Sequence, residues 1–297
     1  ADKQFASMMQ ILKENGLLEN SLLIVLSDHG TSLGLPGDRF LEKKNYQGGP
    51  KRLNWVTLNR LSRPKGVGID LKDNYSLNTA YGQGTEVLSL KQYQVLLAFE
   101  YFGNKGRFPS LFPPHLVSVR ASLLDLAPTI LTFLRLPPMK GVDGVNLLPY
   151  LSNPFKTERK PRPLYLETGY SLSEIETDKI EVEKVLSHTI QLYQVNPKNG
   201  YLSVKPSAKP AVLENKQRAI LLGPWLLARY PATQRMRLVR PEGKLRSEMY
   251  FQPAYYLLAN LKTGQWTVGL DSSFAKQAPR TALLKSFKDF YAGELGS

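Results

Sequence analysis

The order of the first two elements limits what this chain can fold into. Residues 2–15 carry apolar side chains at i, i+3, i+4 and i+7, which predicts an amphipathic helix: Phe5, Met8, Met9 and Leu12. Asn15-Gly16 is a typical stop signal, and the apolar run Leu22–Leu26 follows it. That run is too short for a helix and apolar on both faces, as in a strand inside a parallel sheet. A helix followed by a buried strand predicts an α/β fold. Because the helix needs a sheet to cover, we expect the chain to be the C-terminal portion of a longer protein.

Further elements follow a long stretch without clear periodicity. Residues 31–90 are rich in glycine, lysine and polar side chains, which is typical of a functional loop region. Beyond it we expect strands at 94–99 and 116–119, and then a helix that ends near Leu136. Asp125 is the expected N-cap of this helix, with Pro128 in its first turn.

The proline- and lysine-rich stretch 153–163 is the best candidate for a domain boundary. It divides the chain into an α/β part, residues 1–152, and a smaller α+β subdomain, residues 153–297. In the subdomain we expect the following elements: a strand at 164–167, helix through most of 174–195, two strands of an antiparallel meander at 219–230 and 255–261, a turn at 262–264 and a helix at 282–291.

Composition limits the kinds of partner that the chain is suited to bind and the kinds of catalytic or metal site that its residues can form. The net charge is +14, which favours anionic partners, although charge alone does not choose between nucleic acid, anionic lipid and a small anionic substrate. There is no cysteine, so disulfides, thiolate metal sites and a cysteine nucleophile are excluded within these residues. No apolar run has the roughly 20 residues that a membrane-spanning helix needs.

The segment that most strongly indicates a functional site is Asp28-His29-Gly30, which directly follows the first predicted buried strand. Open α/β sheets place their ligand crevices at the carboxyl ends of strands. A carboxylate oxygen beside an imidazole nitrogen suits a divalent ion such as Zn²⁺ or Mn²⁺. On its own the tripeptide is a weak signal, because such a sequence after a strand is more often an ordinary turn.

Four blocks, in this order, resemble sulfatase-type members of the alkaline phosphatase superfamily. They span most of the chain: Glu14–Gly30, Leu123–Leu131, Gly141-Val-Asp-Gly-Val-Asn-Leu-Leu-Pro149, and a C-terminal set formed by 216–220, 223–227 and 256–261. The resemblance implies a three-layer sheet of the alkaline phosphatase type, of which this chain supplies the C-terminal half, followed by the α+β subdomain with its meander. It also implies that Asp28 and His29 bind a divalent metal ion (Ca²⁺, Mn²⁺ or Zn²⁺), whereas Asp125 and Asp143 have structural roles.

By the same resemblance, the full protein is a hydrolase or group transferase acting on sulfate or phosphate esters. The family's nucleophile, in a motif such as C/S-x-P-x-R, belongs to the N-terminal half, and no such motif occurs here. We therefore expect this chain alone to be inactive and its main partner to be the N-terminal half of the same protein. The family implies a periplasmic or other extracytoplasmic location; a membrane anchor upstream of Ala1 stays open.

Four residues are candidates for binding the anionic ester. Relatives place a histidine before the second strand, but Tyr81–Glu86 has Gln83 there, whose amide oxygen is a weak ligand. Either the site is weakened or the alignment of this stretch is shifted. Lys43 and Lys44, with Lys51 and Arg52, lie where relatives supply a basic residue, although a solvated charge run explains them equally well. For His115 a solvated loop is the competing interpretation, and His188 is expected to be a surface or packing residue.

The C-terminal region leaves a second class of function open. Residues 201–250 contain ten Lys or Arg and three acidic residues, with tyrosines interspersed. Such a surface suits anionic lipid, an acidic glycan or nucleic acid, or it serves solubility alone. No recognised nucleic-acid module accompanies it, which argues against nucleic acid. The alternative to an enzyme is therefore a catalytically inactive module that holds an anionic lipid or glycan through its basic face.

Overall fold

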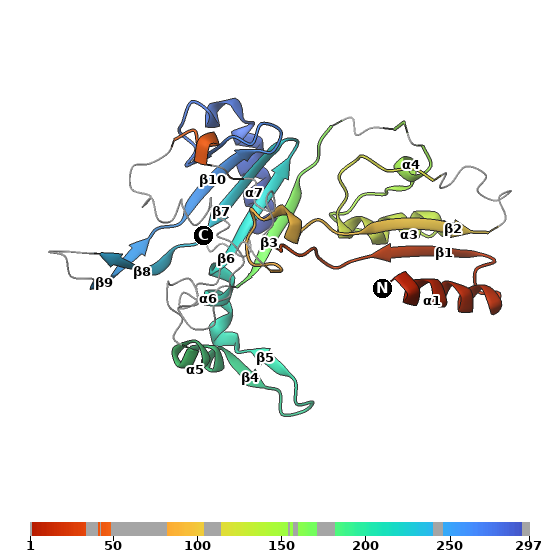
Figure 1. Ribbon diagram of the computed structural model, residues 1–297, viewed down its shortest axis with the longest axis horizontal. Helices are drawn as coiled ribbons and strands as arrows, with labels where there is room; N and C mark the ends of the chain where they lie inside the picture. The colour runs from red at the N-terminus through yellow and green to blue at the C-terminus, as the bar shows by residue number, and fades with distance from the viewer. Residues whose placement is uncertain are drawn as a thin grey trace. The chain divides into compact units, whose positions relative to one another are not determined.

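The computed structural model describes residues 2–33, 41, 43–48, 82–103, 114–153, 155–156, 160–170, 182–239 and 246–292. These form two compact units (Figure 1). Unit 1 comprises Ala1–Asp28 and Val95–Pro161, and unit 2 comprises His29–Gln94 and Arg162–Ser297. The chain passes from unit 1 to unit 2 after Pro161, close to the domain boundary expected after residue 152. However, residues 29–94 group with the C-terminal unit and not with residues 1–28, because Leu41, Val87 and Leu88 lie in the core of unit 2.

Unit 1 contains two strands and three α-helices among its described residues. Its elements are α1 (Asp2–Glu14), β1 (Ser21–Leu26), β2 (Leu97–Phe102), the 3₁₀ turn η3 (Leu123–Asp125), α3 (Leu126–Phe133) and α4 (Leu148–Leu151). α1 and β1 confirm the predicted helix and strand. β1 pairs antiparallel with β2, from Ser21 opposite Phe102 to Leu26 opposite Leu97, so the expected parallel neighbour is wrong for this pair.

Two further expectations for unit 1 need correction. β2 begins three residues later than predicted and exposes Ala98 and Glu100, so it is buried on one face only. Residues 116–119 form no strand, and Leu116 is 91% exposed. Within the described part of the chain no strand pairs with this short apolar stretch, and apolarity alone does not replace backbone hydrogen bonds.

Asp125 is structural, as expected, but in a different way. Ser122 is the N-cap, and the Asp125 carboxylate accepts the Ser122 backbone N–H at 2.8 Å in a capping box. Its other oxygen accepts the Val145 N–H at 2.8 Å, although the side chain is fully buried. Asp125 therefore ties the start of the helix to the loop before α4. Asp143, in that loop, is exposed.

Unit 2 is built on a five-stranded antiparallel sheet of order β11-β10-β7-β6-β3 (Figure 1). Its strands are β3 (Leu164–Tyr170), β6 (Lys216–Leu222), β7 (Trp225–Tyr230), β10 (Tyr255–Asn260) and β11 (Trp266–Val268). The remaining elements are α5 (Val182–Leu192), β4 (Tyr193–Val195), β5 (Leu202–Val204), α6 (Lys209–Glu214), β8 (Thr233–Val239), β9 (Arg246–Gln252), α7 (Arg280–Tyr291) and the 3₁₀ turns η1 (Lys43–Asn45), η2 (Leu90–Gln92), η5 (Pro206–Ala208) and η7 (Ala275–Gln277).

The predicted meander is confirmed, with one strand divided in two. Residues 219–230 are a hairpin, because Gly223, with φ +56°, and Pro224 turn the chain between β6 and β7. The turn at 262–264 and the C-terminal helix are present as expected. The helix expected over 174–195 begins at Val182 within the described residues and ends at Leu192, where β4 starts; residues 171–181 lie outside the described part.

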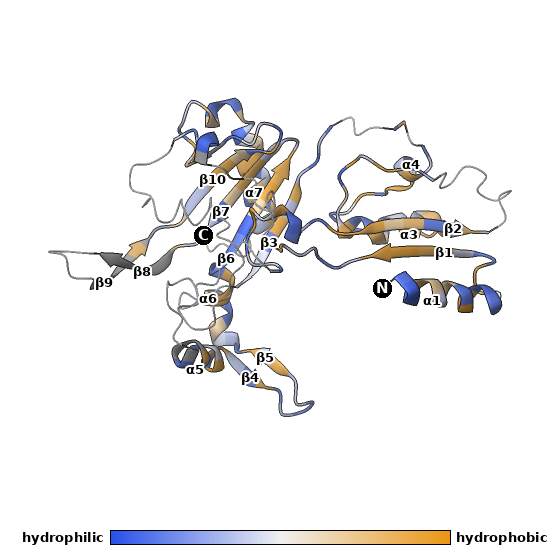
Figure 2. Cartoon of the chain, in the orientation of Figure 1, coloured by the Kyte–Doolittle hydropathy of each residue, from blue (hydrophilic) through white to orange (hydrophobic). Residues whose placement is uncertain are grey.

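Both faces of the five-stranded sheet are buried, and successive side chains alternate between two cores. One core contains Ala219, Leu226 and Leu257 beneath Val87 and Leu88. The other contains Ile220, Leu227 and Leu258 beneath α7. Burying each large apolar side chain contributes about 1.5–3 kcal/mol, so both layers stabilise the sheet. Figure 2 shows the apolar character of these strands.

We expect Phe287→Ala to lower the free energy of unfolding by about 3–5 kcal/mol. Phe287 is fully buried on α7 and contacts the rings of Tyr256 and Tyr291. Phe290→Ala on the same helix is the matched control: its ring is 38% exposed and stacks on Tyr165, so the loss should be about 1 kcal/mol. Urea denaturation followed by circular dichroism measures both, and equal losses would contradict the packing described here.

Candidate functional site

Asp28 and His29 follow the C-terminal end of β1, where the backbone hydrogen bonds between β1 and β2 end. Ser27 extends that ladder: its N–H donates to the Leu96 carbonyl at 3.1 Å, and its Oγ accepts the Leu96 N–H at 2.9 Å. The chain then bends at Asp28, and both Asp28 and His29 are exposed. The strand therefore ends before the two candidate ligands, and its regular alternation does not extend to them.

The contact made by the His29 ring bears on its capacity to bind a metal. Nδ1 lies 3.1 Å from the Gly30 carbonyl oxygen. A hydrogen bond there requires the proton on Nδ1, and in that tautomer Nε2 carries the lone pair that a metal ion needs. The division between the two units falls between Asp28 and His29, so each residue is described within its own unit.

Gly30 is required by a close backbone approach. Its N–H donates to the Gln92 carbonyl at 2.9 Å, and a Cβ at this position would lie 2.0 Å from the Lys91 carbonyl oxygen and 2.8 Å from that of Gln94. Any side chain would therefore displace the backbone. The structure therefore requires glycine here for lack of space.

Gln83 lies beside the segment that follows His29. Ser32 and Gly82 exchange two backbone hydrogen bonds of 3.0 and 2.9 Å, and the Gln83 amide nitrogen donates to Thr31 Oγ1 at 3.0 Å. Gly82 and Gly84 have φ of +96° and +62°, which favours glycine on both sides of Gln83. The structure thus bonds Gln83 to Thr31, which follows His29 by two residues in the chain.

Buried side-chain amides hold this turn in place. Oε1 of Gln92, a fully buried residue, accepts the N–H groups of Thr85 and Glu86 at 2.8 and 3.2 Å. Oε1 of Gln217 accepts the Val87 N–H at 3.1 Å. The carboxylate of buried Glu86 accepts a hydrogen bond from the Tyr230 hydroxyl. The sequence pattern missed the contacts of Gln217 and Tyr230 because they join residues 130 and 144 positions apart. The contacts of Gln92 span only six and seven positions, but they follow no helix or strand periodicity.

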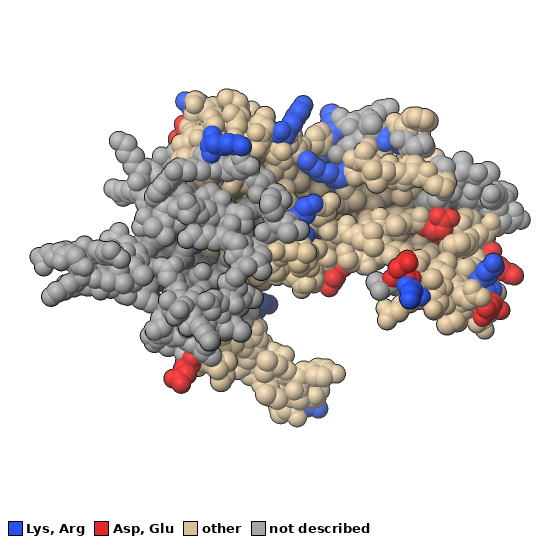
Figure 3. Space-filling model, viewed as in Figure 1, with Lys and Arg blue, Asp and Glu red and all other residues tan. Residues whose placement is uncertain are grey.

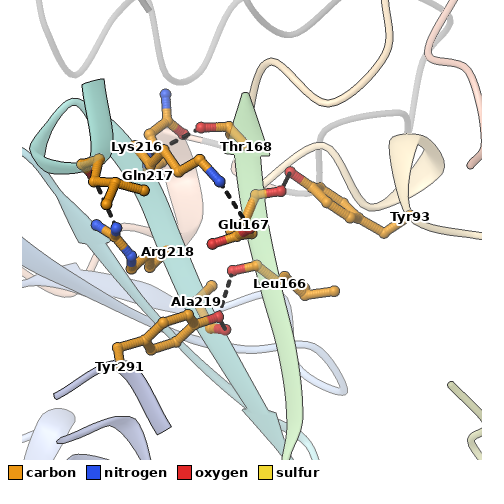
Figure 4. A network of polar contacts seen from close by, with 10 residues as sticks. Tyr93, Leu166, Glu167, Thr168, Lys216, Gln217, Arg218, Ala219 and Tyr291 are labelled. Carbon is orange, nitrogen blue, oxygen red and sulfur yellow. Dashed lines mark hydrogen bonds and ion pairs between the residues drawn. The ribbon is translucent and has the colours of Figure 1, made fainter. Parts of the chain in front are cut away.

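The same network continues to the edge strand β3 (Figure 4). Thr168 Oγ1 accepts the Gln217 N–H at 3.0 Å, and Lys216 pairs with Glu167 at 2.8 Å. The Tyr93 hydroxyl donates to the Glu167 carbonyl at 3.3 Å. Burial, and then the nearby Glu86 charge, raise the pKa of Tyr93 well above its ordinary value. Tyr93 is therefore a protonated structural donor and not a nucleophile.

The other candidate residues have different surroundings. His115 belongs to unit 1, is half-buried, and its Nε2 lies 3.2 Å from the Tyr150 carbonyl oxygen, which ties it to the start of α4. Lys44 is exposed on η1. Lys43 belongs to the same turn, but its side chain lies outside the described residues, as do Lys51 and Arg52. His188, on α5, is half-buried.

The donors suit a divalent ion in kind but not in number. Asp28 offers a carboxylate at the end of the first segment of unit 1, whereas in unit 2 His29 offers an imidazole and Gln83 a weak amide oxygen. Within the described residues, no group of three or more His, Asp or Glu side chains is placed to share a metal ion. A complete site would need further donors.

Comparisons with known proteins return only distant structural similarity. No family model matches the chain, and no curated protein matches its sequence. Among solved structures, it is similar to a phosphonate monoester hydrolase from Silicibacter pomeroyi, with 14% identity and a TM-score of 0.44. The match covers 99% of this chain and 38% of that enzyme. The mixed α/β class with an antiparallel meander is as expected, and the enzyme class stays a proposal.

We expect Gly30→Ala to destabilise the protein by about 1–3 kcal/mol or more, because the added methyl group overlaps the Lys91 carbonyl. Gly169→Ala is the matched control, since the nearest atom to its added Cβ, Gly84 O, lies at 3.8 Å. Thermal unfolding compares the two variants. A Gly30 variant as stable as the Gly169 variant would contradict the close approach.

Tyr93 also makes stability depend on high pH. Its pKa is raised in the folded state, so its contribution is complete below the pKa of an unfolded tyrosine, about 10, and is lost as the pH rises beyond it. We expect Tyr93→Phe to lose stability less steeply between pH 9 and pH 11 than the parent chain (about one unit on either side of that pKa). Urea titrations across this range measure the slopes. Identical slopes would contradict the assignment.

Proposed function

We propose that this chain is the C-terminal part of a metal-dependent hydrolase or transferase that acts on sulfate or phosphate esters. The observation that carries the proposal is the exposed Asp28-His29 pair at the end of β1, with Gln83 held beside the same segment. The ordered motif blocks add the family context. The remaining metal ligands and the nucleophile would come from the N-terminal half of the same protein.

Each residue has a stated role in this proposal. Asp28 and His29 would bind the divalent ion, which when bound polarises the ester oxygens and lowers the pKa of the nucleophile. Hydrogen bonding of His29 Nδ1 to the Gly30 carbonyl would fix the ring tautomer. Gln83 would orient an ester oxygen through its amide, and Lys44 would attract the anionic substrate.

Incomplete coordination also supports the expectation that the isolated chain is inactive. Two adjacent ligands bind a divalent ion weakly compared with a site of four, and this chain offers no nucleophile motif. Turnover of nitrophenyl sulfate or nitrophenyl phosphate by the 297-residue chain alone would contradict the proposal.

Metal analysis of the full-length protein is the decisive test. We expect near-stoichiometric Ca²⁺, Mn²⁺ or Zn²⁺, and loss of the metal with at least a hundredfold loss of esterase activity in Asp28→Ala or His29→Ala. Asp143→Ala is the matched control, because that carboxylate is exposed in unit 1 and should leave the metal content unchanged. A full-length protein that binds no metal would favour the alternative, an inactive module that binds an anionic lipid or glycan.

A further inference from the structure

Gln92 bonds to both segments of unit 2 that carry candidate functional residues. Its backbone carbonyl accepts the N–H of Gly30, which directly follows the candidate histidine, at 2.9 Å. Its side-chain oxygen Oε1 accepts the N–H groups of Thr85 and Glu86 at 2.8 and 3.2 Å, in the turn that contains Gln83. The two segments are far apart in the chain, so a single residue joins them.

The bonds of Gln92 differ in what a substitution can remove. The bond to Gly30 uses the backbone carbonyl, which every residue has. The bonds to Thr85 use the side chain, because the amide nitrogen Nε2 also donates to the Thr85 Oγ1 at 3.1 Å. A change of side chain at position 92 should therefore loosen the turn that contains Gln83 and leave the segment after His29 attached.

The Gln92 amide is placed where it cannot touch a substrate. The residue is fully buried, and its own N–H donates to the Ser89 carbonyl at 2.9 Å within the 3₁₀ turn η2. Glu86 is buried as well, so its N–H lies away from the water that would replace a lost acceptor. Any effect of Gln92 on a reaction therefore has to pass through the turn.

Backbone contacts also hold the turn on either side of Gln83. Gly82 exchanges two hydrogen bonds with the segment after the candidate histidine, and the Gly84 carbonyl accepts a bond of 2.8 Å from strand β3. Both glycines lack a side chain, so they allow the backbone between them to adopt other conformations. The direction of the Gln83 side chain therefore depends on the C-terminal end of the turn, where Gln92 binds.

Charge attracts an anionic ester to this chain but does not orient it. On the face drawn in Figure 3, the described Lys and Arg side chains are scattered among uncharged residues. Scattered charge raises the local concentration of an anion, whereas orientation needs a polar group at a fixed position. Gln83 provides such a group in the proposed function, and a misplacement of about 1 Å can cost on the order of a hundredfold in rate.

We propose that Gln92 is a positioning residue that holds Gln83 in place through the turn at 82–86 and leaves metal binding undisturbed. The inference rests on the proposed ester-hydrolase function and adds a division of labour to it. The backbone of Gln92 supports the segment that follows His29, and its amide supports the turn that orients the ester. Loss of the amide should therefore lower kcat without loss of metal.

Kinetics of the full-length protein with nitrophenyl phosphate and nitrophenyl sulfate tests the role. Gln92→Met keeps an unbranched side chain of similar length but lacks the amide, and we expect about tenfold lower kcat with KM and metal content close to those of the parent. In a Gln83→Ala background the same change should cause little further loss, because its effect passes through Gln83. Gln94→Met is the matched control, since Gln94 is exposed and its change should leave kcat unaltered.

A conservative variant separates positioning from a general loss of stability. Gln92→Glu keeps an oxygen that accepts the Thr85 and Glu86 N–H groups, so it should restore most of the kcat that Gln92→Met loses. The comparison also serves where the methionine variant folds poorly. A glutamate variant that folds and binds metal but is as slow as Gln83→Ala would overturn the positioning role.

Amide hydrogen exchange on the 297-residue chain tests the physical link without any activity. In Gln92→Met the Thr85 and Glu86 N–H groups should exchange about tenfold faster than in the parent, whereas the Gly30 N–H, bonded to the backbone of residue 92, should not change. Unchanged exchange in the turn, or equal acceleration at all three positions, would overturn the proposal.

The two possible failures give different results. A parent protein that binds no metal and cleaves neither ester refutes the proposed function, and the positioning role with it. A parent protein that does both, and in which Gln92→Met keeps its full kcat or adds a further tenfold loss to that of Gln83→Ala, refutes the positioning role alone.

Discussion

The segment from Thr85 to Gln92, which is buried from Glu86 to Ser89 and at Gln92, has to cover a sheet face while its own backbone groups find hydrogen-bond partners. Two glutamine side chains make this possible: Gln92 accepts two N–H groups of the segment, and Gln217, from β6, accepts a third. An unpaired buried N–H would cost about 1–3 kcal/mol. Loss of either glutamine amide would therefore offset much of the stabilisation that burial of Val87 and Leu88 provides. The position of Gln83, and through it the loop after His29, depends on this arrangement.

The burial of both faces of the sheet explains which part of the fold the sequence predicted well. Runs such as Leu226–Ala228 are apolar without alternation, a pattern that is typical of parallel sheets between two layers of helices. Here the same pattern arises in an antiparallel sheet, because α7 covers one face and the segment around Val87 and Leu88 covers the other. Periodicity therefore identified the strands of this sheet correctly, but it also predicted a strand at 116–119, where none forms, and full burial for β1, which is half-buried. Periodicity did not distinguish parallel from antiparallel strands, and at β1 it led to the wrong expectation of a parallel neighbour.

The candidate site was predictable to the extent that it is local in sequence. A carboxylate and an imidazole directly after an apolar run could be identified from residue types alone. The approach of Gly30 to the Lys91 carbonyl could not, because nothing in either residue type indicates that two backbones 61 positions apart meet at van der Waals distance or less. The bond between Gln83 and Thr31 spans 52 positions and depends on two left-handed glycines. Only the resemblance to a family pointed to Gln83, and it did so by position and not by chemistry.

The local backbone at Asp28 bears on whether neighbouring residues can serve one ion. In a regular strand, consecutive side chains point to opposite faces, which would keep an aspartate and the following histidine from converging. The chain bends at Asp28, directly after Ser27 has made the last hydrogen bonds of the ladder with Leu96. This bend ends the strict alternation of side chains directly before His29. Gly30 then allows the chain to turn tightly against Lys91. The strand therefore ends before Asp28, and the glycine two positions later is required by the close approach to Lys91.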